Sequence, residues 1–266
     1  MGVRVKRLLF RSIQTALRMV QLDVFRRRSG YHYMPDYYGR AAHKQADIRE
    51  LPGFGDLADT VIQSGESSLY YDRLYVVYQA ISNLRYIAEE YHGNINLVEV
   101  GVYKGGTSYF IASTADALGI KPAVLHCFDT FEGHPAEDIR PEIDTTHKPS
   151  SFSDTQFAAV KEYLGEFGNV VLYKGRFQDT CSQIGAGKIH FVHLDVDIYE
   201  PTRFALDFFD SRLVVGGITI VDDYGFVTCP GAKWAVDEFL SSRQNYFSLH
   251  FLTGQKLLVK LREEVD

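Results

Sequence analysis

Four aspartates stand out because they follow two short apolar segments in pairs. They are Asp195, Asp197, Asp222 and Asp223. The first pair follows Ile189 to Leu194, and the second pair follows Ile218 to Val221. Carboxylates gathered in one place repel one another unless a cation lies among them. Oxygen donors with room left for water and substrate suit Mg²⁺ or another hard divalent cation, so these residues predict a metal site.

The segments around these aspartates indicate how they would be brought together. Both apolar runs have the β-branched composition of buried parallel strands. Pro201 to Phe209 lies between them and is predicted to form a helix with proline in its first turn. A strand, crossover helix and strand place both carboxyl ends at one sheet edge, where ligands bind in open α/β sheets. For each aspartate taken singly, a helix cap or turn remains the alternative.

A glycine-rich turn lies earlier in the chain. Asn96 to Val100 is predicted to be a strand, and a helix is predicted from Thr107 to Leu118. This layout can hold a nucleotide-like ligand at the helix N-terminus. The pattern is E-x-G-x-x-x-G-G, with Glu99 two residues before Gly101. An acid at that place is unsuited to a pyrophosphate but suits a positively charged ligand, such as the amino acid end of S-adenosylmethionine.

Further along, Asp129 ends a predicted strand and is a candidate for binding ribose hydroxyls, with a simple turn residue as the alternative. Thr130 to Phe152 is polar and without regular period. Because long loops in compact domains are usually functional or disordered, we expect an active-site lid there. Val170 to Lys174 is predicted to be another strand, and the turn from Gly175 to Thr180 follows it.

Composition narrows the class of protein. The chain has 266 residues, 45% of them hydrophobic, which fits one α/β domain with an extension. A net charge of −6 argues against a general nucleic-acid binder. The three cysteines, Cys127, Cys181 and Cys229, show no CxxC spacing. We therefore expect neither a disulfide framework nor a zinc site, and a reducing cytoplasm is the expected location.

The N-terminal segment differs in charge from the rest. Residues 1–28 contain eight Lys or Arg and one acid, so they carry +7 and the remainder −13. Their apolar residues share one helical face, which predicts a basic amphipathic helix over residues 4–28. It is expected either to dock on protein, including a second subunit in a homo-oligomer, or to contact an anionic membrane surface. We predict an extension over residues 1–67 and a main domain over 68–266.

Six motifs occur in order along the chain. They are V-E-V-G-V-Y-K-G-G-T-S, C-F-D-T-F-E-G, Y-K-G-R-F-Q-D-T, H-L-D-V-D-I-Y-E-P-T, G-G-I-T-I-V-D-D-Y and A-K-W-A-V-D-E-F. Together they resemble the macrocin-type sugar O-methyltransferases over about residues 68–260. The resemblance implies an α/β class I methyltransferase fold, which is Rossmann-like. Its seven-stranded, mostly parallel sheet has an antiparallel last strand. S-adenosylmethionine and Mg²⁺ are the implied cofactors, and a hydroxyl of a sugar or other vicinal-hydroxyl metabolite is the implied acceptor.

The resemblance also implies roles for single residues. Asp195, Asp222 and Asp223 correspond to metal ligands, and Asp197 corresponds to the general base. The implied donor-binding positions are Glu99, Gly101, Tyr103, Gly105, Gly106, Thr107, Asp129, Gly175, Phe177 and Asp195. Catechol-type relatives are expected to place a lysine three residues after the first metal aspartate, where this sequence has Ile198. For Asp197 the alternative is a residue that orients a metal ligand.

Two other functions fit the sequence less well. A nicotinamide-dependent dehydrogenase is disfavoured by the glycine pattern and by four aspartates without a use in hydride transfer. A non-catalytic S-adenosylmethionine-binding subunit or scaffold is disfavoured because it would not need the four aspartates. His193 is expected to be a packed core residue rather than a ligand.

Overall fold

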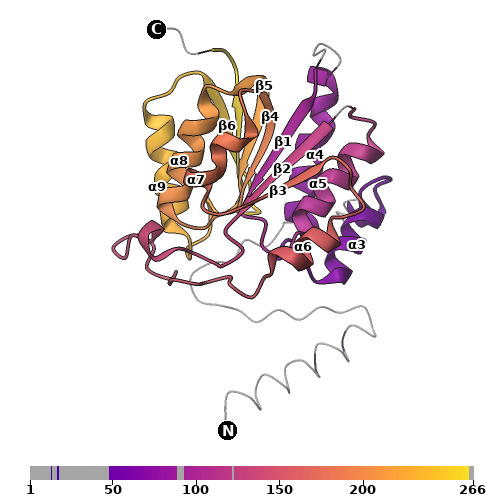
Figure 1. Ribbon diagram of the computed structural model, residues 1–266. Coiled ribbons are helices and arrows are strands. Elements are labelled where there is room, and N and C mark those ends of the chain that lie inside the picture. Colours follow the sequence, from indigo (N-terminus) through magenta and orange to yellow (C-terminus); the bar gives the residue numbers. More distant parts are fainter. Residues whose placement is uncertain (1–12, 14–16, 18–47, 89–92, 122, 264–266) are drawn as a thin grey trace. The chain divides into compact units, whose positions relative to one another are not determined.

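The computed structural model describes residues 13, 17, 48–88, 93–121 and 123–263 (Figure 1). Contacts divide the chain into residues 1–45 and residues 46–266, and the description below concerns the second unit. Of the helix predicted over residues 4–28, only Ile13 and Leu17 are described, and both are helical. The rest of that helix, with its expected docking or membrane contact, lies outside the described residues. Within the described residues, no helix is both long and apolar enough to cross a membrane.

A seven-stranded sheet forms the centre of the domain, in the order β3-β2-β1-β4-β5-β7-β6. The first five strands are parallel, and β7 runs antiparallel to both of its neighbours. The strands are β1 (Ile95–Val100), β2 (Ala123–Asp129), β3 (Val170–Lys174), β4 (Ile189–Leu194), β5 (Leu213–Val221), β6 (Tyr246–His250) and β7 (Lys256–Lys260). The predicted class I sheet is therefore confirmed.

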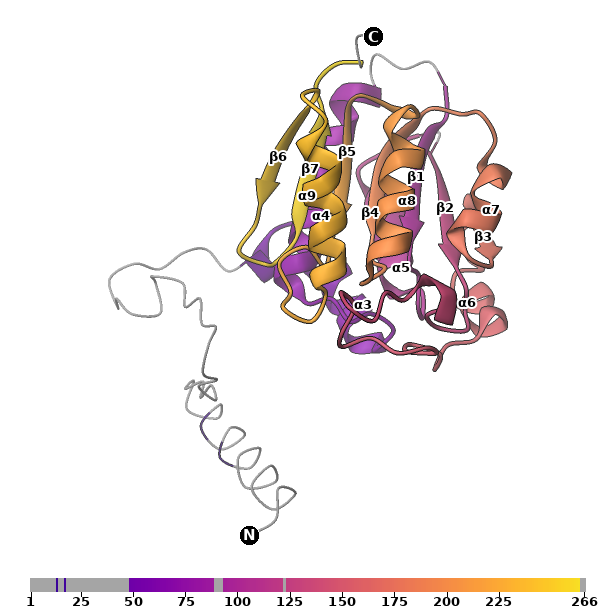
Figure 2. The same ribbon diagram turned by 90° about the vertical axis from the view of Figure 1, so that its left-hand side faces the viewer.

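Helices cover both faces of this sheet (Figures 1 and 2). One face carries α3 (Gly55–Ser64), α4 (Tyr71–Ala88) and α5 (Gly106–Ala117). The other carries α7 (Phe177–Thr180), α8 (Tyr199–Asp210) and α9 (Pro230–Ser241). The short α6 (Phe157–Tyr163) precedes β3, and the described residues also contain the 3₁₀ turns η1 (Ile48–Glu50), η2 (Ala136–Asp138) and η3 (Cys181–Ile184).

Two element boundaries differ from the sequence prediction by two residues or more, for local reasons. Helix α8 begins at Tyr199, two residues before the predicted start at Pro201. Proline is tolerated there because the first helical N–H groups have no intrahelical acceptor. Strand β5 begins at Leu213 rather than at Ile218. Gly216, which has a φ of +80°, interrupts the apolar run. The sequence pattern therefore does not reveal the first half of the strand.

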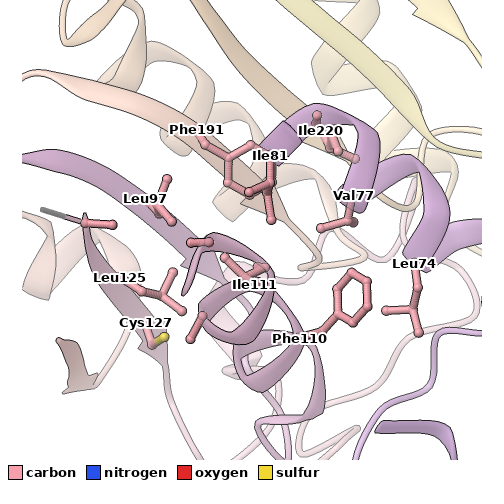
Figure 3. Close-up of a cluster of buried hydrophobic side chains, with 14 of the residues drawn as sticks. Leu74, Val77, Ile81, Leu97, Phe110, Ile111, Leu125, Cys127, Phe191 and Ile220 are labelled. Carbon is pink, nitrogen blue, oxygen red and sulfur yellow. The ribbon is translucent and has the colours of Figure 1, made fainter. Parts of the chain in front are cut away.

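The core consists of two apolar layers, one on each face of the sheet. Successive strand residues point to opposite faces, so Leu97 packs toward α4 and α5 while Val98 packs toward α8 and α9. Figure 3 shows the first layer, where Ile81 of α4 and Ile111 of α5 meet the strand residues. All of these side chains are at most 1% exposed. The two layers fix the strands in the register on which the site depends.

The parallel strands end in register at one edge. Val100 of β1 pairs with Leu194 of β4, which pairs with Val221 of β5. The ladder continues one residue further, because the Asp195 N–H donates to the Val100 carbonyl at 2.9 Å and the Asp222 N–H donates to the Leu194 carbonyl at 2.8 Å. The two predicted acidic strand ends therefore lie side by side.

Candidate active site

A cavity of about 310 Å³ opens at this carboxyl edge of the sheet. Its walls come from the turn after β1, the segment between β2 and α6, the turn after β3, and the loops after β4 and β5. Nine of the residues proposed from the sequence line it: Gly101, Tyr103, Thr107, Asp129, Gly175, Phe177, Asp195, Asp197 and Asp223. The structure thus brings the glycine-rich turn and the acidic strand ends to one cavity.

The turn after β1 is held by contacts on both sides. Gly101 has a φ of +90°, and a Cβ there would lie 1.9 Å from the carbonyl oxygen of Asp195. Only glycine allows β1 and β4 to approach so closely with that backbone conformation. The Asp129 carboxylate accepts the N–H groups of Val102 and Tyr103 at 2.7 and 2.8 Å, and that of Phe131 at 2.6 Å. Asp129 therefore fixes the turn as well as lining the cavity.

Three of the implied donor-binding residues do not reach the cavity wall. Gly105 has a φ of +90°, and its missing Cβ would contact Val160 at 3.1 Å. A Cβ on Gly106 would lie 2.6 Å from backbone atoms of Glu66 and Ser67. These glycines allow other protein segments to pack against the turn.

Glu99 is the third of these residues and is fully buried. Its carboxylate accepts a hydrogen bond from Ser108 and lies 3.1 Å from Nδ1 of His193. Burial raises the pKa of Glu99, while His193 opposes the shift. Glu99 thus faces protein groups, because its side chain lies against Ser108 of α5 and His193 of β4.

His193 connects Glu99 to the acidic cluster. It is fully buried, and its Nε2 lies 3.5 Å from Oδ1 of Asp222. Asp222 also accepts a hydrogen bond from Gln255 at 2.7 Å and contacts the Arg73 guanidinium. Asp222 does not line the cavity. Its carboxylate is held in place by His193, Gln255 and Arg73. The expectation of a packed histidine agrees with this burial.

The three aspartates proposed as metal ligands converge. Asp195, Asp222 and Asp223 each offer a carboxylate oxygen within 4.8 Å of the others. Burial raises the pKa of Asp195, with Arg73 acting in the opposite direction. Burial raises the pKa of Asp223 well above its ordinary range, and its like-charged neighbours add to that shift. A buried, all-oxygen set whose members repel each other fits a hard divalent cation.

Asp197 stands beside this cluster in an unusual backbone conformation. Its φ is +61°, and the Ile198 N–H donates to the Val196 carbonyl at 2.6 Å, which closes a three-residue turn. The Asp197 N–H donates to Oδ2 of Asp223 at 3.0 Å. Such strain persists only when the surroundings enforce it, and it is concentrated at functional sites. The turn presents the Asp197 carboxylate to the cavity.

The segment between β2 and α6, drawn below the sheet in Figure 1, covers one side of the cavity. Asp138 is 4% exposed and pairs with Arg176 of the turn after β3, with Nη2 to Oδ1 at 2.5 Å. Asp144 accepts the Tyr199 N–H at 3.1 Å, at the start of α8. The expected lid is therefore an ordered segment tied to two elements of the domain.

Other residues at the site were not anticipated from the sequence. They are Arg73, His134, His147, Cys229 and Gln255. His134 and His147 lie in the segment expected to form the lid. The sequence therefore predicted that this segment lies near the cavity, but not which residues the two histidines contact. The rest come from elements far apart in the chain, and no spacing rule could have grouped them.

The strand order, the antiparallel β7 and a cavity at the carboxyl edge define the class I methyltransferase fold. The profile of the macrocin O-methyltransferase (TylF) family matches residues 65–249, so the chain belongs to that family. The O-methyltransferase NovP has a similar structure, with a TM-score of 0.65 and 24% identity over 74% of this chain and 83% of that one. The calicheamicin methyltransferase CalS11 follows with a TM-score of 0.55 and 19% identity, over 82% and 98% of the two chains.

Curated relatives match part of the chain. The 8-demethyl-8-(2,3-dimethoxy-alpha-L-rhamnosyl)-tetracenomycin-C 4'-O-methyltransferase of Streptomyces olivaceus is 32% identical over 52% of this chain and 56% of its own length. The demethyldecarbamoylnovobiocin O-methyltransferase of Streptomyces niveus is 28% identical over 60% and 64%. The mycinamicin III 3''-O-methyltransferase of Micromonospora griseorubida is 26% identical over 54% and 59%. The chain thus spans less than two thirds of each of these relatives.

Proposed function

We propose that this protein is a Mg²⁺-dependent O-methyltransferase. It transfers a methyl group from S-adenosylmethionine to a hydroxyl of a sugar, or of another glycosylated or vicinal-hydroxyl metabolite. The observation that carries the proposal is that the walls of one cavity combine the glycine-rich turn after β1 with the carboxylates after β4 and β5. A methyl donor and a cation-bound acceptor would lie within reach of each other there. The name of the Streptomyces olivaceus relative, which includes a rhamnosyl group, supports a glycoside acceptor, and all three curated relatives are named O-methyltransferases.

The donor is assigned to the β1 and β3 side of the cavity. Gly101, Tyr103 and Thr107 offer backbone and hydroxyl groups beside the start of α5. Asp129 would receive ribose hydroxyls while it holds the turn, and Gly175 with Phe177 would border the base. Glu99 would act indirectly, through Ser108 and His193. With these assignments, the methyl group of the donor would lie toward the acidic strand ends.

The acceptor is assigned to the side formed by the loops after β4 and β5. Asp195, Asp222 and Asp223 would hold Mg²⁺, which when bound lowers the pKa of a coordinated hydroxyl and fixes its orientation. Asp197 would accept the hydroxyl proton as the methyl group is transferred, because its carboxylate lies in the cavity beside the three ligands. Holding the hydroxyl in line with the methyl group would supply much of the acceleration.

A membrane contact through residues 4–28, a homo-oligomer and a cytoplasmic location remain predictions. A small-molecule acceptor, with no nucleic acid as substrate, follows from the proposed chemistry.

The direct test is calorimetric titration of S-adenosylmethionine and of Mg²⁺ into the wild type and Asp222→Asn. We expect donor binding in both proteins and at least about tenfold weaker Mg²⁺ binding in the variant, because one buried carboxylate is lost. Asp116→Asn is the matched control, since Asp116 is an exposed residue paired with Lys121 at the surface. Donor binding without any Mg²⁺ binding would discard the chelation mechanism. A wild type that binds no donor would contradict the methyltransferase assignment.

A further inference from the structure

A second group of metal-ligating side chains lies beside the three aspartates and differs from them in chemistry. Nε2 of His134 lies 3.5 Å from Oδ2 of Asp197. Sγ of Cys229 lies 3.5 Å from Oδ1 of Asp197 and 3.6 Å from Nε2 of His147. The two histidines and the aspartate each offer a ligand atom within 4.8 Å of the others. The group thus combines two imidazoles, a thiol and a carboxylate.

Three separations between side chains of this group match those around a tetrahedral zinc ion. Zinc is bound at about 2.0–2.2 Å by nitrogen or oxygen and about 2.3 Å by sulfur, so neighbouring ligand atoms lie about 3.3–3.7 Å apart. The three distances above fall in that interval. Nε2 of His134 is also buried and makes no hydrogen bond with the described residues, and the Asp197 carboxylate at 3.5 Å is the charged group beside it. A ring nitrogen in that position needs a partner.

We infer that His134, His147, Asp197 and Cys229 form a binding site for Zn²⁺ or a similarly soft divalent cation. Thiolate and imidazole donors select such ions, whereas the all-oxygen set of Asp195, Asp222 and Asp223 suits Mg²⁺. The cysteine spacing gives no sign of this site because its ligands come from three separate segments. They lie in the β2–α6 segment, the turn after β4 and the loop before α9.

The surroundings of the site allow the ligands to turn toward a cation. Nε2 of His147 now lies 3.0 Å from the Thr228 carbonyl, which also accepts a hydrogen bond from Thr146. That carbonyl therefore keeps a partner when His147 binds metal. The rings of His134 and His147 meet edge to face at 5.2 Å, and Phe152 packs against both. An apolar wall of this kind limits water access and restricts the ring orientations.

The site shares Asp197 with the proposed methyl-transfer chemistry. A cation bound to its carboxylate would compete with its service as proton acceptor, so Zn²⁺ is expected to inhibit methyl transfer. This consequence rests on the proposed function, whereas binding of the cation does not. The experiment below therefore measures binding, and its result is independent of any activity.

The test is titration of Zn²⁺ into the full-length protein, followed by calorimetry, with Co²⁺ as a spectroscopic substitute. We expect one equivalent of Zn²⁺ to bind, and Co²⁺ to give tetrahedral ligand-field bands with a thiolate-to-metal charge-transfer band. Cys229→Ser should remove the charge-transfer band and weaken Zn²⁺ binding at least about tenfold. His147→Gln should weaken binding similarly, and its partly exposed position makes misfolding a small risk.

Two control variants make the result specific. Cys181→Ser changes another buried thiol, outside both groups, and should leave Zn²⁺ binding and the Co²⁺ spectrum unchanged. Asp222→Asn removes a carboxylate of the neighbouring cluster and should leave the charge-transfer band in place. The inference is overturned if the wild type binds no Zn²⁺, or if Cys229→Ser and His147→Gln bind it as tightly as the wild type does.

Discussion

The two sides of the cavity differ in how their polar and charged groups are paired. On the β1 side, the polar groups are satisfied within the protein, since Asp129 accepts three backbone N–H groups and Gly101 packs against the carbonyl of Asp195. On the β4 and β5 side, Asp195 and Asp223 are crowded with like charge, and burial raises the pKa of both. The polar groups on the β1 side are therefore paired within the protein, whereas the carboxylates on the β4 and β5 side carry unfavourable electrostatic energy.

This difference teaches how to separate stability from function in this chain. Substitutions on the β1 side should mainly lower the free energy of unfolding, because they disturb groups that already pair well. Substitutions on the acidic side should mainly lower activity, and some should even stabilise the fold, as is common where a site needs strained or repelling groups. Each prediction below tests one half of that statement.

The largest effect is expected for Asp197→Asn. Asparagine tolerates the positive φ of this position, so the turn should persist while the proton acceptor is lost. We expect kcat for methyl transfer to fall by about 10²–10⁴, the usual contribution of a general base. The melting temperature should stay close to that of the wild type.

Steady-state methylation assays with an accepted glycoside and circular dichroism melting would measure both quantities. Asp207→Asn serves as the control because Asp207 is a partly exposed residue of α8 that pairs with Arg203 and Arg243. If Asp197→Asn kept kcat within about tenfold of the wild type, Asp197 would be an orienting residue rather than the base.

Gly101→Ala is expected to have the next largest effect, on stability. The new methyl group would lie 1.9 Å from the Asp195 carbonyl oxygen in a backbone conformation that L-residues rarely adopt. We expect the free energy of unfolding to fall by about 3 kcal/mol or more, combining backbone strain with a steric clash. Urea denaturation followed by fluorescence would measure the change.

Gly119→Ala separates those two contributions. Gly119 also has a positive φ, of +68°, but a Cβ there would meet nothing within 4 Å. This variant should lose only about 1–2 kcal/mol, from backbone strain alone. Equal losses in the two variants would show that the close contact between β1 and β4 adds nothing to stability.

The elements that carry strong periodicity or apolar runs were predictable from the sequence. The parallel order, the crossover helix and the two acidic strand ends follow from local patterns and from the handedness of such units. Helix α3 (Gly55–Ser64) was missed, because the breaker residues from Leu51 to Gly55 conceal its start. A helix whose first residue is a glycine, two residues after Gly53, gives little local signal.

The contacts within the site were less predictable because they are not local. Glu99 has the sequence position of a ligand-binding acid, yet the strand turns its side chain toward His193. The direction depends on which face of β1 each residue takes and on what packs there. The partners of Asp222, namely Arg73 and Gln255, come from α4 and the end of the chain. Sequence spacing does not reveal contacts between residues so far apart in the chain.

The smallest effect, and one of opposite sign, is expected for Asp223→Asn without added metal. Burial and neighbouring carboxylates raise the folded-state pKa of Asp223 above its unfolded value of about 3.9. Between these two values, the unfolded state has released a proton that the folded state still holds. The free energy of unfolding therefore falls as the pH rises through this interval, and the loss is complete above the folded-state pKa. Asparagine removes this ionisation while its side-chain oxygen can still accept the Asp197 N–H.

At neutral pH the metal-free variant should therefore melt above the metal-free wild type, by about 2–4 °C for each kcal/mol of repulsion relieved. At pH values near the ordinary aspartate range, the two proteins should differ less. Added Mg²⁺ should raise the melting temperature of the wild type and leave the variant nearly unchanged, because the cation stabilises only a fold that binds it. Melting curves from acidic to neutral pH, with and without Mg²⁺, test all three statements. A metal-free variant that melts below the wild type at every pH would mean that Asp223 stabilises the fold through its hydrogen bonds, and that the acidic side stores no electrostatic strain at this residue.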